Sequence, residues 1–134
     1  MLLLDYYKID VSGLYCVIVG RSDIVGKPLA MLLSNKLHNA TVTLCHSKTK
    51  NVIQHLKLAD LIIIAIGQPE FLTKDMIKPG AIIIDVGINY VDGKIVGDVG
   101  DVGKAYSYLT PVPKGVGPMT IAALMKNTFM ASQK

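Results

Sequence analysis

Short, uninterrupted apolar runs alternate along the chain with segments of helical periodicity. The runs are rich in β-branched residues and are bounded mainly by glycine or polar residues: Tyr15–Val19, Thr41–Cys45, Leu61–Ile66 and Ala81–Asp85. Continuous apolar runs, rather than strict alternation of apolar and polar residues, are typical of strands that are covered on both faces in a parallel sheet. We therefore expect these runs to pair as parallel strands.

Two segments between the runs carry apolar residues at helical spacing. Pro28 suits the first turn of one predicted helix, and Asn51 is placed to cap the other. The apolar positions are Leu29, Leu32 and Leu33 in the first segment and Val52, Ile53 and Leu56 in the second.

The rest of the chain predicts a hairpin, a last strand and two terminal helical segments. An Asp92-Gly93 pair between apolar residues predicts a β-hairpin over Ile88–Val96, and a short strand is expected over Tyr108–Thr110. Met1–Ile9 resembles the tail of a helix whose apolar side chains need partners. The last helix is expected to begin near Pro118, with a stripe of Ile121, Leu124, Met125, Thr128 and Phe129. This alternation predicts a doubly wound, Rossmann-like α/β fold, with a mainly parallel sheet and helices on both faces.

Composition indicates one compact domain and argues against two classes of partner. The 134 residues are 51% hydrophobic, and Leu61–Ile66 is far shorter than the roughly 20 residues that cross a bilayer. Met1–Asp5 has neither a basic region nor a cleavage site, so we expect no signal peptide, no membrane partner and a cytoplasmic protein, with a mitochondrial location left open. The net charge of +4 is scattered and Trp is absent, which argues against a nucleic-acid partner.

Cysteines and histidines give no sign of a metal or nucleophilic centre. Cys16 and Cys45 lie singly in apolar runs and are interpreted as buried free thiols in a reducing compartment. No cluster has the spacing of metal ligands, so no metal is expected. His46 has no partner at catalytic spacing and is assigned a binding or structural role, whereas His38 and His55 are expected at the surface.

The segment Gly20–Gly26 follows the first predicted strand and precedes the first predicted helix. A dinucleotide-binding fold places its phosphate-binding turn at this point. Gly20 and Gly26 suit the tight turn and the close approach that a diphosphate at a helix N-terminus requires, and the Ser22 hydroxyl can donate a hydrogen bond. The spacing is not G-x-G-x-x-G, so an ordinary strand-to-helix turn remains an alternative.

The end of the second predicted strand distinguishes between the two nicotinamide cofactors. NAD-binding folds place an acid there to hold the ribose 2′-hydroxyl, but residues 45–50 contain none. The Ser47 hydroxyl, two lysines and nearby Arg21 suit a 2′-phosphate instead. A charge-assisted hydrogen bond contributes about 1.5–3 kcal/mol, so Arg21 alone would give a preference on the order of tenfold to hundredfold. The cofactor predicted is NADP.

Four sequence blocks occur in the order found in a known enzyme family: Val19–Pro28, Thr41–Thr49, Lys78–Asn89 and Pro111–Thr120. Together they resemble the C-terminal NAD(P)-binding domain of the bifunctional methylenetetrahydrofolate dehydrogenase/methenyltetrahydrofolate cyclohydrolases. Such enzymes oxidise 5,10-methylene- to 5,10-methenyltetrahydrofolate with NADP, hydrolyse the product to 10-formyltetrahydrofolate and work as homodimers. The resemblance implies tetrahydrofolate derivatives as substrates and a homodimer as the assembly.

The resemblance also implies roles for individual residues and segments. Gly20, Arg21 and Ser22 would hold the cofactor phosphates, Ser47 would lie near the adenosine ribose, and Ile88 would lie by the nicotinamide. The folate-facing loop would be Pro113, Lys114, Gly115, Val116 and Gly117. Residues 1–12 would be the end of an interdomain helix and a linker, 13–118 the cofactor domain, and 119–134 a helix that returns toward the N-terminal folate domain.

Three features depart from the family pattern. The N-terminal folate domain with its Lys and Tyr acid/base motif is outside this chain, so no catalytic residue is assigned. Lys114 stands where the family has a glycine, and a positive φ there would cost roughly 1 kcal/mol or more. The stretch from Gly97 to Tyr108 is short, so a reduced helix is expected before the last strand.

Two functional hypotheses follow from the sequence. The chain is the cofactor domain of the bifunctional enzyme, as a fragment or a degenerate copy, and binds NADP without turnover. Alternatively, it is a non-catalytic dinucleotide-binding or dimerisation module. An upstream reading frame that encodes the Lys-containing domain would favour the first.

Overall fold

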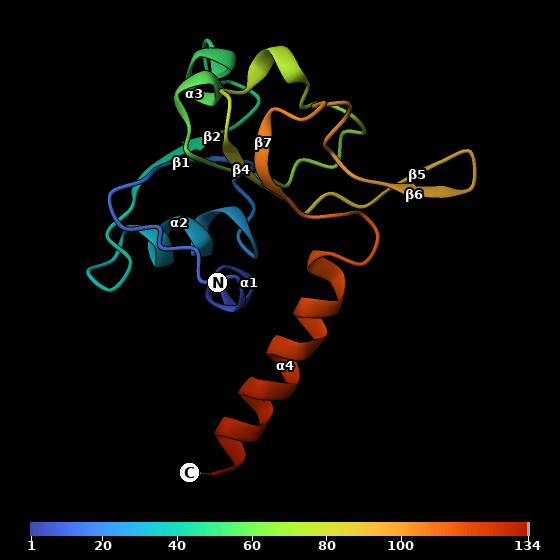
Figure 1. The fold of residues 1–134 in the computed structure, drawn as a ribbon. Coiled ribbons are helices and arrows are strands. Elements are labelled where there is room, and N and C mark those ends of the chain that lie inside the picture. The colour runs from blue at the N-terminus through green and yellow to red at the C-terminus, as the bar shows by residue number, and fades with distance from the viewer. Residues whose placement is uncertain (134) are drawn as a thin grey trace.

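A computed structural model describes residues 1–133, which form a parallel sheet between two layers of helices. Figure 1 shows that the sheet runs through the centre of the molecule. The helical elements are α1 (Leu2–Tyr6), α2 (Gly26–Ser34), α3 (Val52–Leu58), the single 3₁₀ turn η1 (Lys74–Met76) and α4 (Val116–Ser132). The strands are β1 (Tyr15–Val19), β2 (Thr41–Cys45), β3 (Leu61–Ile64), β4 (Ala81–Asp85), β5 (Asn89–Val91), β6 (Lys94–Val96) and β7 (Tyr106–Leu109).

The sheet has the strand order β2-β1-β3-β4-β7, and every neighbouring pair is parallel. Each residue of β3 is buried, which explains why this strand consists of Leu and Ile alone. The connection after β1 runs toward β2, whereas the connection after β3 runs in the opposite direction, toward β4. This reversal makes the carboxyl ends of β1 and β3 the topological switch point of the sheet.

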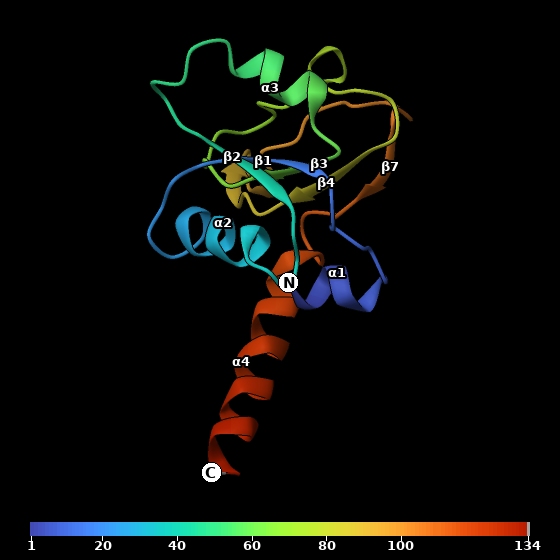
Figure 2. The same cartoon turned by 90° about the vertical axis from the view of Figure 1, so that its left-hand side faces the viewer.

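Helices cover both faces of the sheet, as the sequence predicts. In Figures 1 and 2, α3 lies on one side of the sheet, and α1 and α2 lie on the other. Leu56 of α3 belongs to a core that includes Val17 and Ile62. Leu33 of α2 belongs to a second core, which forms on the opposite face around Ile18. Because strand side chains alternate between faces, successive residues of β1 contribute to different cores.

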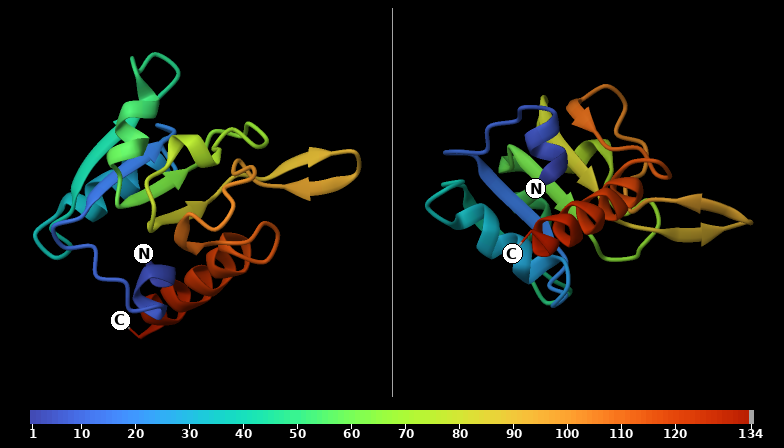
Figure 3. Two further views of the ribbon diagram at one scale, coloured as in Figure 1. Left: turned by 45° about the horizontal axis from the view of Figure 1, so that its top comes forward. Right: turned by 90° about the horizontal axis from the view of Figure 1, so that it is seen from below.

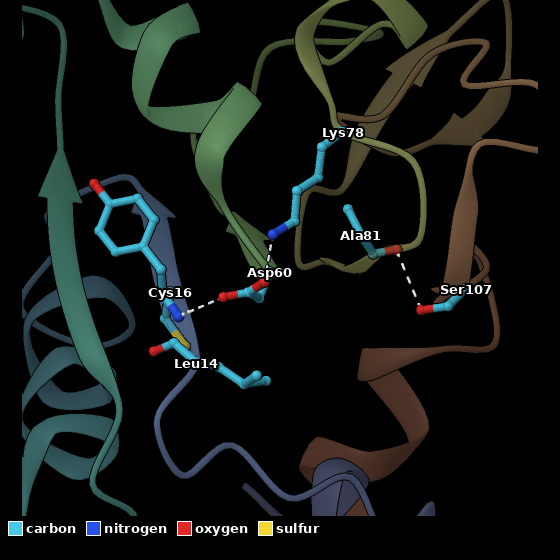
Figure 4. A network of polar contacts seen from close by, with 7 residues as sticks. Leu14, Cys16, Asp60, Lys78, Ala81 and Ser107 are labelled. Carbon is cyan, nitrogen blue, oxygen red and sulfur yellow. Dashed lines mark hydrogen bonds and ion pairs between the residues drawn. The ribbon is translucent and has the colours of Figure 1, made fainter.

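A polar network joins three strands at their amino ends (Figure 4). Asp60, directly before β3, accepts a hydrogen bond of 2.7 Å from the Tyr15 N–H at the start of β1. The same carboxylate forms an ion pair with Lys78, which precedes β4. The cause of the lowered pKa of Asp60 is first the hydrogen bond from Lys78 and then that from Tyr15. The network holds the edge of the sheet opposite to the switch point.

Two elements project from the sheet. The β5–β6 hairpin forms a separate antiparallel pair and extends sideways (Figures 1 and 3). Helix α4 extends away from the body with its first part beside α1. The predicted stripe on α4 is exposed: Ile121, Leu124, Met125, Thr128 and Phe129. None of the helices described within residues 1–133 is long and apolar enough to cross a membrane.

Several expected boundaries differ from those observed. The third strand ends at Ile64 instead of Ile66 because the Ile66 N–H turns to a carboxylate of a later loop. The last strand is Tyr106–Leu109, and the last helix begins at Val116 rather than near Pro118. The described chain has no helix between β6 and β7, where the sequence predicted a shortened one.

Three side chains also behave differently from expectation. Asn51 occupies the N-cap position of α3, but its side chain makes no capping hydrogen bond, and its backbone is left-handed with φ 55°. His38 and His55 are both half-buried rather than on the surface. His38 Nδ1 lies 3.1 Å from Asn35 Oδ1, and His55 Nδ1 lies 3.2 Å from the Tyr15 hydroxyl, which comes from a segment far away in the sequence. Local sequence patterns do not reveal such a contact between distant segments.

Candidate functional site

The predicted site residues all lie on loops or helix starts that follow the carboxyl ends of the sheet strands. In doubly wound folds, ligands bind in the crevice at these ends, next to the switch point. Here the loops after β1 and β2 carry the first group of predicted residues, and the loops after β4 and β7 carry the second.

The loop after β1 requires glycine at both of its ends. Gly20 has φ +121°, and a Cβ on it would lie 2.3 Å from the carbonyl oxygen of Ala65. A Cβ on Gly26 would lie 1.9 Å from the carbonyl oxygen of Gly20. Both distances are far below van der Waals contact, so a side chain would force the backbone apart. The turn therefore needs glycine at both positions because of contacts within the chain itself, and the approach of a diphosphate stays a prediction.

Ser22 organises the start of α2. Its Oγ accepts hydrogen bonds from the N–H groups of Val25 (3.1 Å) and Gly26 (3.4 Å). Its carbonyl oxygen accepts one from the Lys27 N–H at 3.1 Å. The first N–H groups of the helix are therefore satisfied within the loop, and the hydrogen of the Ser22 hydroxyl remains to be donated.

The donors of this loop that have no partner within residues 1–133 come before the helix. Among residues 1–133, the backbone N–H groups of Arg21 and Ser22 have no hydrogen-bond acceptor, and the Arg21 guanidinium has no ion-pair partner. Both residues are exposed. The sequence predicted phosphate binding both at the helix N-terminus and by Gly20, Arg21 and Ser22, and the unpaired donors lie at the second of these places. An anionic group fits this donor set.

The loop after β2 lies against the loop after β1, because the Gly20 N–H donates to the Cys45 carbonyl at 2.9 Å. His46 closes this second loop. Its backbone N–H donates to Thr49 Oγ1 at 2.8 Å, and its Nδ1 accepts from the Lys48 N–H at 3.2 Å. Ser47 and Lys48 are exposed beside it. His46 thus has a structural role in this loop. The exposed groups are the hydroxyl of Ser47 and the ammonium of Lys48.

The two cysteines are buried free thiols, as expected. Burial raises the pKa of Cys16 to about 12, and burial also raises the pKa of Cys45. Because the thiolate is the reactive form, neither side chain is suited to nucleophilic chemistry at neutral pH. Within residues 1–133, no group of three or more His, Cys, Asp or Glu side chains is arranged to hold a metal ion.

A cavity of about 590 Å³ opens between the β5–β6 hairpin and the loop after β7. It brings together the second group of predicted residues, which are Ile88, Pro113, Lys114, Gly115, Val116 and Gly117. The Ile88 side chain is 61% exposed, although it follows a buried strand. The Val112–Pro113 peptide bond is cis. An apolar wall with a cation at its rim is suited to a flat, mainly apolar ring that bears polar groups.

Lys114 has φ +80°, the left-handed conformation that favours glycine. The next residue, Gly115, has no room for a side chain, because a Cβ would lie 2.3 Å from the Pro111 carbonyl oxygen. Lys114 therefore has the positive φ that the sequence analysis considered for this family glycine position, and a residue other than glycine adopts it under strain.

Two buried carboxylates beside this cavity were not predicted. Asp85 ends β4 and Asp98 follows β6, and both are almost completely buried. Burial is the main cause of the raised pKa of Asp85, the backbone N–H groups of Asp98, Val99 and Gly87 oppose it, and the Asp98 carboxylate adds to it. The available signal was an acid at the end of an apolar strand, and a second acid directly after the glycine that follows a predicted hairpin.

Known proteins match this chain along its whole length. The family described as "Tetrahydrofolate dehydrogenase/cyclohydrolase, NAD(P)-binding domain" matches residues 1–134. The "Bifunctional protein FolD" of Acholeplasma laidlawii is 56% identical over 131 residues, covering 96% of this chain and 47% of its own. That of Campylobacter concisus is 57% identical over 136 residues, with coverages of 99% and 47%. The chain spans about half the length of the curated relatives it matches.

Solved structures agree with the sequence relatives. The bifunctional FolD methylenetetrahydrofolate dehydrogenase/cyclohydrolase of Campylobacter jejuni superposes with a TM-score of 0.95 at 51% identity, covering 99% of this chain and 48% of its own. The methylenetetrahydrofolate dehydrogenase-cyclohydrolase of Trypanosoma brucei, complexed with NADP cofactor and an inhibitor, gives a TM-score of 0.85 at 39% identity, with coverages of 96% and 46%.

Proposed function

Since this chain belongs to the family of tetrahydrofolate dehydrogenase/cyclohydrolase NAD(P)-binding domains, we propose that it is the NADP-binding half of a bifunctional enzyme. The parent protein would oxidise 5,10-methylenetetrahydrofolate to 5,10-methenyltetrahydrofolate and hydrolyse that product to 10-formyltetrahydrofolate. The C. jejuni and T. brucei proteins, which bear these activities in their names, support this proposal.

The observation that carries the proposal is the donor set at the switch point. The unpaired N–H groups of Arg21 and Ser22 suit the cofactor phosphates, at a turn that Gly20 and Gly26 keep compact. Ser47 lies on the adjoining loop, where no acid is present to hold a free ribose 2′-hydroxyl. A 2′-phosphate beside Arg21 is therefore favoured over that hydroxyl.

The other end of the site supports the placement of the nicotinamide and the folate. When bound, NADP supplies a nicotinamide ring that accepts a hydride. Ile88 would provide an apolar surface for that ring, and the Pro113–Gly117 loop would close the same cavity toward the folate. These residues would orient the reactants and exclude water, while acid/base chemistry is assigned to the other half of the parent protein.

Exposed apolar surface supports the need for that other half. Ile121, Leu124 and Phe129 of α4 are each more than 60% exposed, as is Tyr6 of α1. Covering such a helix is favourable, and the relatives are about twice as long as this chain. The family resemblance, together with an exposed hairpin that is unpaired at its edges, supports a homodimer as the assembly of the parent.

Calorimetric titration of the purified chain with NADPH and NADH tests the proposal. We expect NADPH to bind more tightly, by about tenfold or more. Arg21→Ala should weaken NADPH binding by a similar factor and leave NADH binding little changed, because only NADPH carries the 2′-phosphate. The exposed Lys126→Ala, on α4, is the control for loss of a positive charge. Equal losses for both cofactors in Arg21→Ala would remove the 2′-phosphate assignment, and no NADPH binding by the wild type would overturn the proposed function.

A further inference from the structure

The buried carboxylates of Asp85 and Asp98 have no part in the function proposed so far. Asp98 is 0% exposed and Asp85 is 3% exposed, and neither belongs to an ion pair formed by the described residues 1–133. Burying a carboxylate without hydrogen bonds is costly, so the partners of these two groups indicate what they stabilise.

Asp85 holds the segment that follows the β5–β6 hairpin. Its Oδ1 accepts from the N–H groups of Gly87 (2.9 Å) and Asp98 (3.1 Å), and its Oδ2 accepts from that of Val99 (3.0 Å). A Cβ on Gly97 would lie 1.9 Å from Asp85 Oδ2. The chain therefore passes directly over the end of β4, and only glycine permits this approach.

Asp98 connects the end of β3 with the entry of the hairpin. Its Oδ2 accepts from the N–H groups of Ile66 (2.7 Å) and Gly67 (3.0 Å). Its Oδ1 accepts from Asn89 Nδ2 at 2.9 Å. All three donors lie at the carboxyl edge of the sheet, and Asn89 is the first residue of β5.

The two carboxylates together fix the turn Gly87–Asn89 at both of its ends. Gly87 is held by Asp85, and Asn89 is held by Asp98. A Cβ on Gly87 would lie 2.2 Å from Asp98 Cγ, so the turn is packed directly on this carboxylate. Ile88, between these residues, is exposed and lines the 590 Å³ cavity. Its position is set by the backbone on either side.

We propose that Asp98, through its hydrogen bond to Asn89, is a positioning residue for the nicotinamide half of the cofactor. The inference rests on the proposed function, because it takes Ile88 as the surface for the nicotinamide ring. Asp98 does not touch the cofactor. It holds the Gly87–Asn89 turn in register with the β3 loop, and Asp85 holds Asp98 in turn. The adenosine half would lie by the loops after β1 and β2, which receive no hydrogen bond from Asn89, so its binding is expected to be insensitive to that residue.

Two variants separate positioning from general stability. Asn89→Asp places a second carboxylate against Asp98, which replaces a donor with a like charge. Adding Asp98→Asn to that variant restores a matched pair. The oxygen of the new amide accepts from Ile66 and Gly67, and its NH₂ group donates to the carboxylate introduced by Asn89→Asp. The double variant also has the net charge of the wild type.

The measurement is calorimetric titration with NADPH and with 2′,5′-ADP, which lacks the nicotinamide. We expect Asn89→Asp to weaken NADPH binding about tenfold, equivalent to about 1.4 kcal/mol, with 2′,5′-ADP affinity unchanged. The double variant should return NADPH affinity to within about twofold of the wild type. Asn127→Asp, an exposed substitution on α4, carries the same charge change and should affect neither ligand.

Each outcome decides the inference. Equal weakening of both ligands by Asn89→Asp would assign a general structural role to the pair and overturn positioning. No recovery in the double variant would also overturn it. If Asn89→Asp does not fold, Asn89→Ala at this half-buried position takes its place and should weaken NADPH alone. If the wild type binds both ligands and no variant weakens NADPH selectively, the proposed function stands and this inference falls.

Discussion

Lys114 is strained, and its position shows how one residue can trade stability for a charge in a binding loop. Its φ of +80° is a conformation that glycine adopts freely and other residues adopt at a cost. The side chain is exposed at the rim of the cavity that Ile88 also lines. A cation at this point is available to an anionic group of the proposed folate ligand.

Replacing Lys114 with Gly should stabilise the chain. Relief of the positive φ contributes about 1 kcal/mol, and the added freedom of the unfolded chain removes part of it, so we expect a net gain of about 0.5 kcal/mol. Urea unfolding followed by circular dichroism measures this gain.

The matched control is Lys104→Gly, in an exposed turn where φ is not positive. It adds the same chain freedom without relief of strain, and it should destabilise the chain by about 0.5–1 kcal/mol. If both substitutions lower the free energy of unfolding, Lys114 is not strained.

At the scale of elements, the two edges of the sheet are held in different ways. At the carboxyl edge, the buried carboxylates of Asp85 and Asp98 accept hydrogen bonds from backbone N–H groups of the loops that follow the strands. The amino edge uses Asp60, which joins the start of β1 to the segment before β4. The first arrangement shapes the edge that carries the proposed binding site, and the second keeps the amino ends of β1, β3 and β4 in register.

Asp60→Asn should weaken the amino edge in a pH-dependent way. The variant keeps an acceptor for the Tyr15 N–H but loses the ion pair with Lys78, which is about one-third exposed, so we expect a loss of about 0.5–1 kcal/mol at pH 7. The pKa of Asp60 is lowered in the folded state. Its contribution is therefore present above the usual pKa of an Asp and is lost as the pH falls through the lowered value.

Urea unfolding at pH 7 and again below about pH 3 tests this prediction, because the stability difference between wild type and variant should shrink in acid. Asp23→Asn removes the solvent-exposed pair with Lys27 and should leave the free energy of unfolding unchanged at both pH values. If the difference in unfolding free energy between the wild type and Asp60→Asn grows in acid, the Asp60 carboxylate does not stabilise the amino edge through its ion pair with Lys78.

At the scale of the whole molecule, residues 1–133 supply the proposed cofactor site, and acid/base steps on a substrate are assigned to the other half of the proposed parent protein. The cavity is open on one side, and α1 and α4 extend apolar surface beyond it. Hydride transfer requires cofactor and substrate in register. If this half binds only the cofactor, it cannot hold a substrate in register with the nicotinamide ring.

The chain alone should therefore bind NADPH and show no measurable turnover of 5,10-methylenetetrahydrofolate or 5,10-methenyltetrahydrofolate. Absorbance assays of both steps measure this, with a full-length relative such as the C. jejuni protein as the positive control. Turnover by the chain alone at the rate of the full-length protein would show that the chemistry resides in this half.

The positions of the strands and of the phosphate loop could be predicted because they depend on local features. Apolar runs flanked by glycines specify buried parallel strands, and Gly20 and Gly26 signal a compact turn wherever the chain later folds. Boundaries were less accurate, as at Ile64, because the Ile66 N–H leaves the ladder for a residue that is 32 positions away.

By itself, the sequence determined the α/β class, the glycine-bounded loop after β1, the absence of an acid after β2 and the family resemblance. Only the tertiary structure decided that Ser22 satisfies the first N–H groups of α2, that Ile88 shares a cavity with the loop after β7, and that Asp85 and Asp98 support the turn beside it. Most of these contacts join segments from different strands. Their partners are chosen by the packing of the sheet, which no local pattern of residues records.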